Sequence, residues 1–238
     1  KMASTFNEML DTVEEVFIHE KQFSSDVSHE LRTPITVILA QSDYALQYSD
    51  TFEEAKESLE VINRHAKRMT NLINQIMELS KLERQKEIEK EKINLSNIVL
   101  QLLEDYKPLL ESKNLNLVYN VEKDLRIQGN KIMLERVFLN ILMNAVKFTK
   151  TNIEVSLTRE DKTAVLKIRD DGIGISEENK KFIWERFFQV NDSRNKEENK
   201  GSGLGLSMVK KIVDLHSATI DLESELEQGT CFIIKFNM

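Results

Sequence analysis

The chain has 238 residues, 40% of them hydrophobic, which is enough for two domains of modest size or for one domain with a long helical element. Its net charge of −7 and its 33 scattered Lys and Arg residues exclude the dense basic stripe of a nucleic-acid-binding protein, so no nucleic acid is expected as a partner. One cysteine and four dispersed histidines exclude a disulfide framework and a zinc-type site. With no run of about 18 apolar residues and no signal-peptide pattern, the sequence predicts a soluble chain in a reducing cytoplasm.

The first half of the chain predicts two long helices, because no glycine occurs before Gly129. Apolar residues spaced three and four apart form the seam of a coiled coil or bundle, at Leu59, Ile62, Ala66, Met69, Ile73 and Ile76. An earlier helix is indicated by Phe6, Leu10, Val13 and Phe17, and after a change of phase by Phe23, Val27 and Leu31. Ser49 and Asp50 are expected to end this helix and cap the next. The resulting hairpin cannot shield both apolar faces, so we expect it to dimerise into a four-helix bundle.

The charged stretch "RQKEIEKEK", residues 84–92, is compatible with a hinge or with a helix that continues through solvent. After Ile93 the pattern becomes mixed. Amphipathic helices are expected at 94–113, 131–149 and 203–217, with another beginning near Ser176. Alternating strands are expected at 114–121, 152–160, 163–172, 219–225 and 230–237. Strands with helices gathered on one face predict an α+β sandwich.

The stretch "SDVSHELRTPIT", residues 25–36, carries a candidate nucleophile. At about 100° per residue, His29 lies about 200° from Val27 and Leu31, so the imidazole points to water if those two face the core. Thr33 returns to within about 40° of His29. These two polar side chains are therefore expected on one exposed face of the helix.

The residues around His29 favour chemistry on its ring. Neutral imidazole is a good nucleophile near pH 7, and a neighbouring carboxylate such as Glu30 that accepts the ring proton strengthens it. Pro34 lacks an N–H group and is expected to bend the helix. An ordinary surface histidine before a helix-bending proline remains an alternative.

A polar face about 60° wide on the helix "NILMNAVKF" carries Asn140, Asn144 and Lys147. The opposite arc is apolar, with Phe138, Ile141, Leu142, Ala145 and Val146. Asparagine is a mediocre helix former, but its amide oxygen can bind Mg²⁺, and lysine can meet phosphate as a point charge. A merely solvated helix face is the alternative.

The stretch "LKIRDDGIGIS" places Asp170 on the same face of a strand as Ala164, Leu166 and Ile168. A carboxylate there is costly without a partner, and the exocyclic amine of a purine would supply one. Gly172 and Gly174 let a ligand approach the backbone closely, although an ordinary strand-to-helix turn would use the same glycines.

The stretch "NKGSGLGLSM" places Gly201, Gly203 and Gly205 directly before a helix, where backbone N–H groups can cradle phosphate. Its spacing is not that of a Walker A loop or a dinucleotide fingerprint. The polar residues 191–200 before it are expected to form a mobile lid over phosphate.

Taken in order, "SHELRTP", "NILMNAVKF", "DDGIGI", "WERFF" and "GSGLGL" resemble the H and N boxes, the first glycine box, the F box and the second glycine box of sensor histidine kinases of two-component systems. The resemblance extends from about residue 20 to the C-terminus. It implies a signal-transducing helical linker at 1–20, a dimerisation and histidine phosphotransfer domain at 21–83, a linker at 84–92 and a catalytic ATP-binding domain at 93–238. The last would be an α/β sandwich of the gyrase, Hsp90 and MutL (GHKL, or Bergerat) type.

The resemblance also implies roles for single residues. His29 resembles the phosphoacceptor, Glu30 the acid that assists its attack, and Thr33 the residue that positions water for dephosphorylation of the partner. Residues similar to the family's nucleotide contacts are Asn140, Asn144, Lys147, Phe148, Asp170, Gly172, Gly174, Arg186, Gly201, Gly203, Leu204, Gly205 and Leu206. Asn144 would also contact Mg²⁺.

The implied function is an ATP- and Mg²⁺-dependent protein histidine kinase that phosphorylates its own His29 and passes the phosphoryl group to an aspartate of a response regulator receiver domain. Phosphatase activity toward the regulator is expected as well. The first residues, "STFNEMLDTVEE", resemble the end of a HAMP linker, which implies a homodimeric cytoplasmic fragment of a bacterial receptor anchored in the cell membrane by missing N-terminal segments. Two other classes remain open: a switch that only binds nucleotide, and a plain GHKL-type ATPase.

Some positions depart from the family pattern. Asp171 stands where asparagine is frequent, Gln189 where arginine is often seen, and Ser217-Ala218 where a glycine pair is usual. Gln189 could weaken a phosphate contact, for which Arg186 or Arg194 could compensate. Structural roles are expected elsewhere, with His19, His65 and His216 on helix surfaces or ends, Trp184, Phe182, Phe187 and Phe188 in packing, and Cys231 as a small buried side chain.

Overall fold

The computed structural model describes the backbone of residues 2–190 and 201–238, and within those ranges the side chains of Phe17 and of residues from Glu20 onward. The chain divides into two compact units, residues 1–77 and 78–238, which are described separately. The predicted lid at 191–200, including Arg194, and the side chain of His19 lie outside the described residues. No helix in the described ranges combines the length and hydropathy needed to span a membrane.

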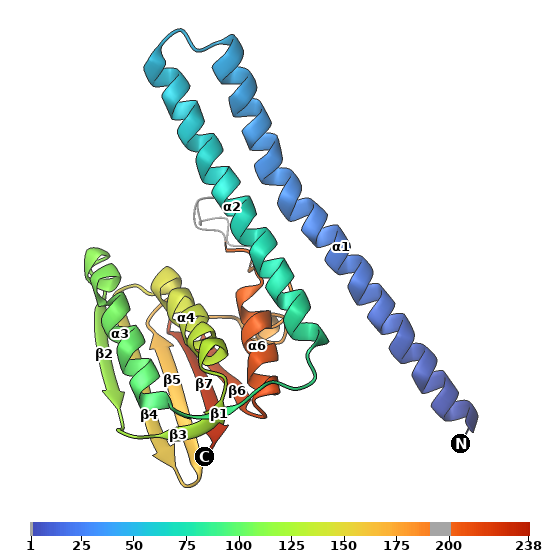
Figure 1. The fold of residues 1–238 in the computed structure, drawn as a ribbon, viewed down its shortest axis with the longest axis vertical. Helices are drawn as coiled ribbons and strands as arrows, with labels where there is room; N and C mark the ends of the chain where they lie inside the picture. Colours follow the sequence, from blue (N-terminus) through green and yellow to red (C-terminus); the bar gives the residue numbers. More distant parts are fainter. Residues whose placement is uncertain (1, 191–200) are drawn as a thin grey trace. The chain divides into compact units, whose positions relative to one another are not determined.

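The first unit is a hairpin of two long helices that lie side by side, α1 (Met2–Gln47) and most of α2 (Phe52–Arg84) (Figure 1). The Thr51 hydroxyl caps α2 by accepting a hydrogen bond from the Glu54 N–H at 3.3 Å, and the Glu54 carboxylate accepts one from the Asp50 N–H at 2.9 Å. The helix stop was predicted correctly, but the cap is Thr51, because its hydroxyl stands three residues before the N–H that needs an acceptor.

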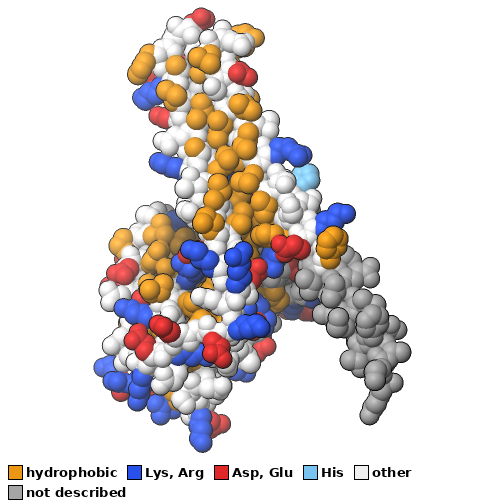
Figure 2. All heavy atoms as spheres, turned by 45° about the vertical axis from the view of Figure 1, so that its right-hand side comes forward, with side chains coloured by type: hydrophobic (Ala, Val, Ile, Leu, Met, Phe, Trp, Pro, Cys, Tyr) orange, Lys and Arg blue, Asp and Glu red, His pale blue; other side chains and the backbone are white. Residues whose placement is uncertain are grey.

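The apolar seam of α2 divides into two rows. Ile62, Met69 and Ile76 are half-buried, whereas Leu59 and Ile73 are 61% and 43% exposed. Further exposed apolar side chains on the hairpin are Ile35, Leu39, Leu46, Phe52 and Met77, and Figure 2 shows hydrophobic side chains running along its length. One hairpin therefore buries only one row, as the heptad spacing predicts for a bundle that needs more helices.

The second unit is a two-layer α/β sandwich, as predicted. Its main sheet has the order β2-β4-β5-β7-β6, and helices α3, α4 and α6 cover one face (Figure 1). The helices are α3 (Leu95–Ser112), α4 (Lys131–Phe148), α5 (Glu177–Lys180) and α6 (Gly205–Leu215). The strands of this sheet are β2 (Asn116–Val121), β4 (Asn152–Glu160), β5 (Thr163–Asp170), β6 (Thr219–Glu225) and β7 (Gly229–Asn237). Neighbouring strands are antiparallel except for the parallel pair β2 and β4.

A small antiparallel ribbon of β1 (Glu91–Asn94) and β3 (Arg126–Gly129) was not predicted. Helix α2 ends at Arg84, so the alternative of a helix that continues through 84–92 is wrong, and residues 91 and 92 belong to β1. Strands of only four residues, such as β1 and β3, are too short for their pattern to be recognised from sequence.

The core lies between the helices and the sheet. The predicted apolar arc of α4 is confirmed, since Phe138, Ile141, Leu142, Ala145 and Val146 are all buried. They face strand residues such as Val155 and Ile168, which alternate with exposed or half-buried neighbours. Burying one such large side chain stabilises the fold by about 1.5–3 kcal/mol, so this layer fixes the position of α4 and its polar face over the sheet.

His216 ties the end of α6 to the start of α4. Its Nε2 accepts a hydrogen bond from the Asn130 N–H at 3.0 Å, and its Nδ1 lies 2.7 Å from the Ile212 carbonyl oxygen. This hydrogen-bond pattern requires a neutral ring with its proton on Nδ1. Burial favours the same neutral form, because it lowers the pKa of His216. The residue stands at a helix end, as expected, but it is buried.

Candidate functional site

His29 lies on the exposed face of α1, as the helix geometry predicts. Its side chain is exposed, whereas Val27 and Leu31 are half-buried. Thr33 is also exposed, and its hydroxyl donates a hydrogen bond to the His29 carbonyl at 3.4 Å. Glu30 is half-buried beside them. The imidazole is thus open to solvent, with a carboxylate next to it in the chain.

Pro34 is buried, and α1 continues through it without a break. Proline removes one hydrogen-bond donor from a helix interior, which is the physical basis of the predicted bend. The bend itself remains a prediction.

Asp170 is a buried carboxylate at the end of β5. Its side chain is only 5% exposed, and its Oδ1 accepts a hydrogen bond from the Gly172 N–H at 2.9 Å. Burial raises the pKa of Asp170 to about 6, against backbone hydrogen bonds from Gly172 and Thr230 that favour the charged form. The expectation of a costly carboxylate at the end of an apolar face is confirmed.

The turn after Asp170 is closely packed and requires its glycines. A Cβ on Gly172 would lie 2.1 Å from the Phe148 carbonyl oxygen, so the turn abuts the end of α4. Gly174 has φ +70°, and a Cβ there would lie 1.9 Å from the Glu225 carbonyl oxygen. Neither position can carry a larger residue without a shift of the backbone. The helix after this turn begins after Ser176, but the Ser176 side chain makes no cap hydrogen bond.

The polar face of α4 meets the glycine-rich loop. The Asn140 Nδ2 donates to the Arg136 carbonyl at 2.9 Å, and a Cβ on Gly205 would lie 2.7 Å from the Asn140 Oδ1. Asn144 is half-buried on the same face, and no described residue forms a hydrogen bond with its side chain. The structure thus brings this helix face against the loop before α6, a contact that the sequence did not predict.

Lys147 extends this face toward the start of the loop. Its Nζ lies 4.6 Å from the centroid of the Phe148 ring and 3.5 Å from the position of a Cβ on Gly201. The side chain as a whole is exposed, but its ammonium group is partly enclosed, and burial lowers the pKa of Lys147. A cation therefore stands beside the loop that was predicted to hold phosphate.

The glycine-rich loop is held against the aromatic segment at 182–188. Gly203 has φ +72°, and a Cβ there would lie 2.6 Å from the Phe187 backbone, whose N–H donates to the Gly203 carbonyl at 3.0 Å. Leu204 is fully buried and Leu206 half-buried at the start of α6. Gly205 begins that helix, so its first N–H groups are available near Asn140.

The aromatic residues of this segment pack as predicted. Trp184 meets the ring of Phe232 edge-on, with centroids 6.1 Å apart, and Phe182 stacks on Phe188 at 5.7 Å. Cys231 is buried in a small cluster with Val165 and Ile233.

Arg186 forms an ion pair that the sequence did not predict. Its Nη2 lies 2.6 Å from the Glu83 Oε1, and Arg136 on α4 likewise lies 2.5 Å from Glu78. Both acids belong to the last turns of α2, which are part of the second unit. Arg186 therefore meets a carboxylate here, and its predicted contact with phosphate remains a prediction.

Asp171 has a structural role that was not predicted from the sequence, in which it stood out only as a departure from the family pattern. Its two carboxylate oxygens accept hydrogen bonds from the segment Thr149–Asn152: from both threonine hydroxyls, from the Asn152 amide, and from the N–H groups of Lys150, Thr151 and Asn152, at 2.6–3.0 Å. Burial raises the pKa of Asp171, but these hydrogen bonds outweigh it and hold the pKa far below its usual range. The polar run "TKTN" directly after a helix was the available signal.

We expect Asp171→Asn to destabilise the second unit by about 1–3 kcal/mol, because an amide nitrogen would face N–H and O–H donors. Urea denaturation of the chain would measure this loss. Asp161→Asn is a matched control in the exposed turn between β4 and β5. Equal stability of the two variants would contradict a structural role for Asp171.

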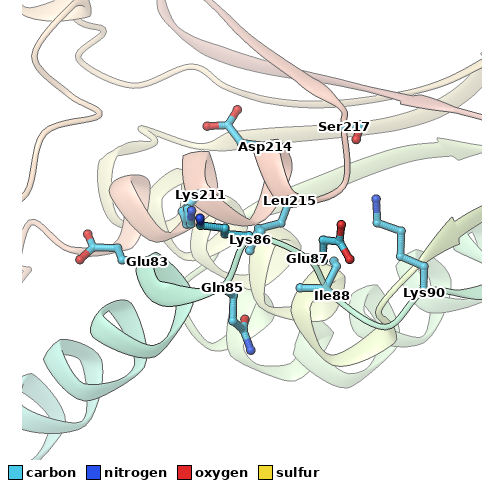
Figure 3. A pocket seen from close by; sticks show the side chains of 10 residues that line it. All are labelled: Glu83, Gln85, Lys86, Glu87, Ile88, Lys90, Lys211, Asp214, Leu215 and Ser217. Carbon is cyan, nitrogen blue, oxygen red and sulfur yellow. The ribbon is translucent and has the colours of Figure 1, made fainter. Parts of the chain in front are cut away.

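A cavity of about 630 Å³ lies between the linker and the C-terminal half of α6 (Figure 3). It shares no lining residue with the predicted nucleotide contacts. Its lining carries both signs of charge, with Lys86, Lys90 and Lys211 opposed by Glu83, Glu87 and Asp214. This balance favours no particular class of ligand, so the cavity is not assigned to the site.

The residues of the second unit fit a Mg²⁺ ion that is bound mainly through nucleotide phosphates. The described residues contain no cluster of three acidic, histidine or cysteine side chains that could hold a metal alone. The amide oxygens of Asn140, which lies beside Gly205, and of Asn144, one turn later on α4, are hard oxygen donors. Mg²⁺ commonly uses one or two protein oxygens together with phosphates and water.

Two family models match the chain. The His Kinase A (phospho-acceptor) domain matches residues 19–85, which include His29. The histidine kinase-, DNA gyrase B- and HSP90-like ATPase matches residues 129–238, which include the polar face of α4, Asp170 and the glycine-rich loop.

Curated relatives match most of this chain. It is 32% identical over 239 residues to the signal transduction histidine-protein kinase ArlS of Staphylococcus aureus, covering 99% of this chain and 52% of ArlS. It is 33% identical over 243 residues to an uncharacterized sensor-like histidine kinase of Porphyra purpurea, covering 93% of this chain and 37% of that protein. The chain thus spans about half the length of these relatives, or less.

Solved structures share the fold. Histidine kinase AdeS of Acinetobacter baumannii matches 88% of this chain and 98% of its own, with a TM-score of 0.69 and 22% identity. Histidine kinase ThkA, solved in complex with response regulator protein TrrA, matches 94% of this chain and 63% of its own, with a TM-score of 0.76 and 23% identity. These likenesses show the fold. The two family models and the curated relatives show that the chain belongs to the sensor histidine kinases of two-component systems.

Proposed function

We propose that this chain is the catalytic core of an ATP-dependent protein histidine kinase that phosphorylates His29 and passes the phosphoryl group to an aspartate of a response regulator. The observation that carries the proposal is the pairing of two features in one chain. The exposed imidazole of His29 lies in the region that matches the phospho-acceptor domain. The buried carboxylate of Asp170, suited to a purine amine, and the glycine-rich loop lie in the region that matches the ATPase domain.

In the proposed site, Asp170 accepts a hydrogen bond from the adenine amine, and Gly172 and Gly174 keep the adjoining turn free of side chains. The carboxylate is buried and only partly compensated by hydrogen bonds, so a purine amine would supply the partner that it needs. Phe148 adds an aromatic contact for the base. The second glycine-rich loop surrounds the phosphates together with Lys147. This loop includes Gly201, Gly203, Leu204, Gly205 and Leu206.

The proposed reaction is an in-line phosphoryl transfer. A ring nitrogen of neutral His29 forms a bond to the γ-phosphorus while the bond to the β-γ bridging oxygen breaks and ADP leaves. Glu30 accepts the proton of the imidazole ring and so raises its nucleophilicity. Mg²⁺, held through Asn144 with Asn140 beside it, would neutralise charge on the phosphates. Positioning and charge neutralisation therefore supply most of the catalysis.

We further propose that the active form is a homodimer within a membrane-anchored bacterial receptor, whose cytoplasmic part includes this chain. The exposed apolar row of the hairpin, with Leu59 and Ile73, supports pairing of two hairpins into a four-helix bundle. The resemblance of the first residues to a HAMP linker supports the anchored parent. The ThkA kinase was solved bound to a response regulator protein, which supports a receiver domain as the partner of this chain.

Incubation of the chain with γ-labelled ATP and Mg²⁺ tests the proposal. We expect label that is lost in acid and retained in base, as a phosphoramidate on histidine requires, and that passes to a purified receiver domain. Label stable in acid would point to a hydroxyl acceptor and would contradict the assignment. Nucleotide binding without any label would favour a switch that only binds ATP.

Thr33 is proposed to position water when the kinase dephosphorylates its regulator. Its hydroxyl lies on the exposed face that carries His29, four residues away. Thr33→Ala should therefore leave the autophosphorylation rate within about twofold of the wild-type rate. It should slow regulator dephosphorylation roughly tenfold or more, because the attacking water would lose the group that positions it. Assays of both reactions on one preparation would check this, with Thr36→Ala one turn later as the control. An equal decrease in both activities would refute this division of roles.

A further inference from the structure

Two short stretches of the chain, residues 187–189 and 201–203, lie opposite each other. The Gln189 Nε2 donates a hydrogen bond to the Gly201 carbonyl at 2.9 Å, and two residues away the Phe187 N–H donates to the Gly203 carbonyl at 3.0 Å. The pairs 187 with 203 and 189 with 201 follow one register, as in a short antiparallel ladder. The second contact uses the backbone, but the first depends on the Gln189 side chain.

This side chain acts on the residue that stands beside the Lys147 ammonium group. The Gly201 Cα directs its missing Cβ to a point 3.5 Å from the Lys147 Nζ, so the position of Gly201 determines the space around that cation. Gly203 cannot move toward the aromatic segment, because its backbone already touches that of Phe187. Gln189 therefore holds the loop at Gly201, whereas Gly203 is fixed by its close packing against Phe187.

We propose that Gln189 is a positioning residue, which presets the glycine-rich loop next to Lys147 before nucleotide binds. This inference rests on the proposed function, because it assigns the loop and Lys147 to the phosphates of ATP. The neutral amide of Gln189 supplies a hydrogen-bond donor to the loop without adding a charge. Gln189 then contributes through the shape of the loop, so its effect should appear in nucleotide affinity rather than in the rate of phosphoryl transfer.

The test compares Gln189→Met with the wild-type chain. Methionine has a similar length but no donor, and it adds no charge near the phosphates. Gln101→Met, on the exposed face of α3, is the matched control, and Gln189→Arg is the rescue variant because it restores a donor. Two kinds of measurement are made. Nucleotide titration and kinetics give the Kd, the KM and the maximal autophosphorylation rate, and hydrogen exchange without nucleotide gives the exchange rate of the Phe187 amide.

We expect Gln189→Met to raise Kd and KM about 2–13-fold, the value of one neutral hydrogen bond, and to leave the maximal rate within about twofold. Exchange at Phe187 should become faster, and Gln189→Arg should restore both properties. Unchanged exchange, or a lower maximal rate at unchanged KM, overturns the inference. If exchange becomes faster but the wild-type chain binds no nucleotide, the proposed function fails while the role of Gln189 in holding the loop stands.

Discussion

His29→Gln should reduce ATP-derived, acid-labile label on the chain to background. Glutamine keeps a polar side chain of similar size but has no nitrogen lone pair that can act as a nucleophile at neutral pH. His29 is exposed and no packing depends on its ring, so the variant should unfold at the same denaturant concentration as the wild-type chain. The measurement is label after acid and base treatment, together with nucleotide affinity, which should not change.

His65→Gln is the control for this experiment, since it makes the same substitution on α2. Retained label in His29→Gln would show that another residue is the acceptor. Steady ATP hydrolysis that is indifferent to His29→Gln and accompanied by no label would favour a plain GHKL-type ATPase. With the labelling experiment on the wild-type chain, in which nucleotide binding without label would favour a switch, these outcomes separate the kinase from both alternative classes.

Asp170→Asn should weaken adenine nucleotide binding roughly 100-fold, since a charged hydrogen-bond acceptor contributes up to about 3 kcal/mol and an amide nitrogen would face the adenine amine. Calorimetric titration with ADP would measure the loss. Preference for ADP over GDP should disappear in the variant, because guanine presents a carbonyl oxygen that an amide can meet. Unchanged affinity and preference would show that Asp170 does not read the base.

The raised pKa of Asp170, about 6, gives this variant a second signature. A carboxyl whose folded pKa exceeds its unfolded value stabilises the fold below the unfolded pKa, and this stability is lost as pH rises through the folded pKa. For a change from 3.8 to about 6, the wild-type chain should lose about 3 kcal/mol relative to Asp170→Asn between about pH 4 and pH 7. Urea denaturation at several pH values would check the difference.

The ionisation of Asp170 should also make ADP affinity depend on pH. If adenine binds the charged carboxylate, ADP affinity of the wild-type chain should be constant above about pH 7 and fall up to tenfold per pH unit below about 6. Asp170→Asn should lack this dependence. A wild-type affinity that is flat across the range would contradict binding to the ionised form.

Helix and strand periodicity predicted most of the fold. The seam of α2, the apolar arc of α4 and the paired strands β4 and β5 follow from spacings of 3.6 and 2 residues. The ribbon of β1 and β3 was missed because strands of four residues carry too little pattern. The cap of α2 was misplaced by one residue, since Ser49, Asp50 and Thr51 are all good capping types and only geometry selects among them.

Features of the candidate site were predictable where they depend on the periodicity of a single helix or strand. The exposure of His29 and the burial of Asp170 follow from helix and strand geometry. The hydrogen bonds to Asp171, the ion pair between Arg186 and Glu83 and the contact between Gln189 and Gly201 join different elements or distant positions. No local period encodes such contacts, because they depend on how the elements pack.

The sequence by itself determined the family resemblance, the order of the motifs and the residue types that could bind ATP and accept a phosphoryl group, because these reside in local stretches of the chain. Only the tertiary structure decided that Asn140 and Lys147 on α4 meet the glycine-rich loop, that Asp170 is desolvated enough to shift its pKa, and that Gln189 holds Gly201. Desolvation and contacts between distant residues arise when the helices pack on the sheet, so they are properties of the assembled core and of no single segment.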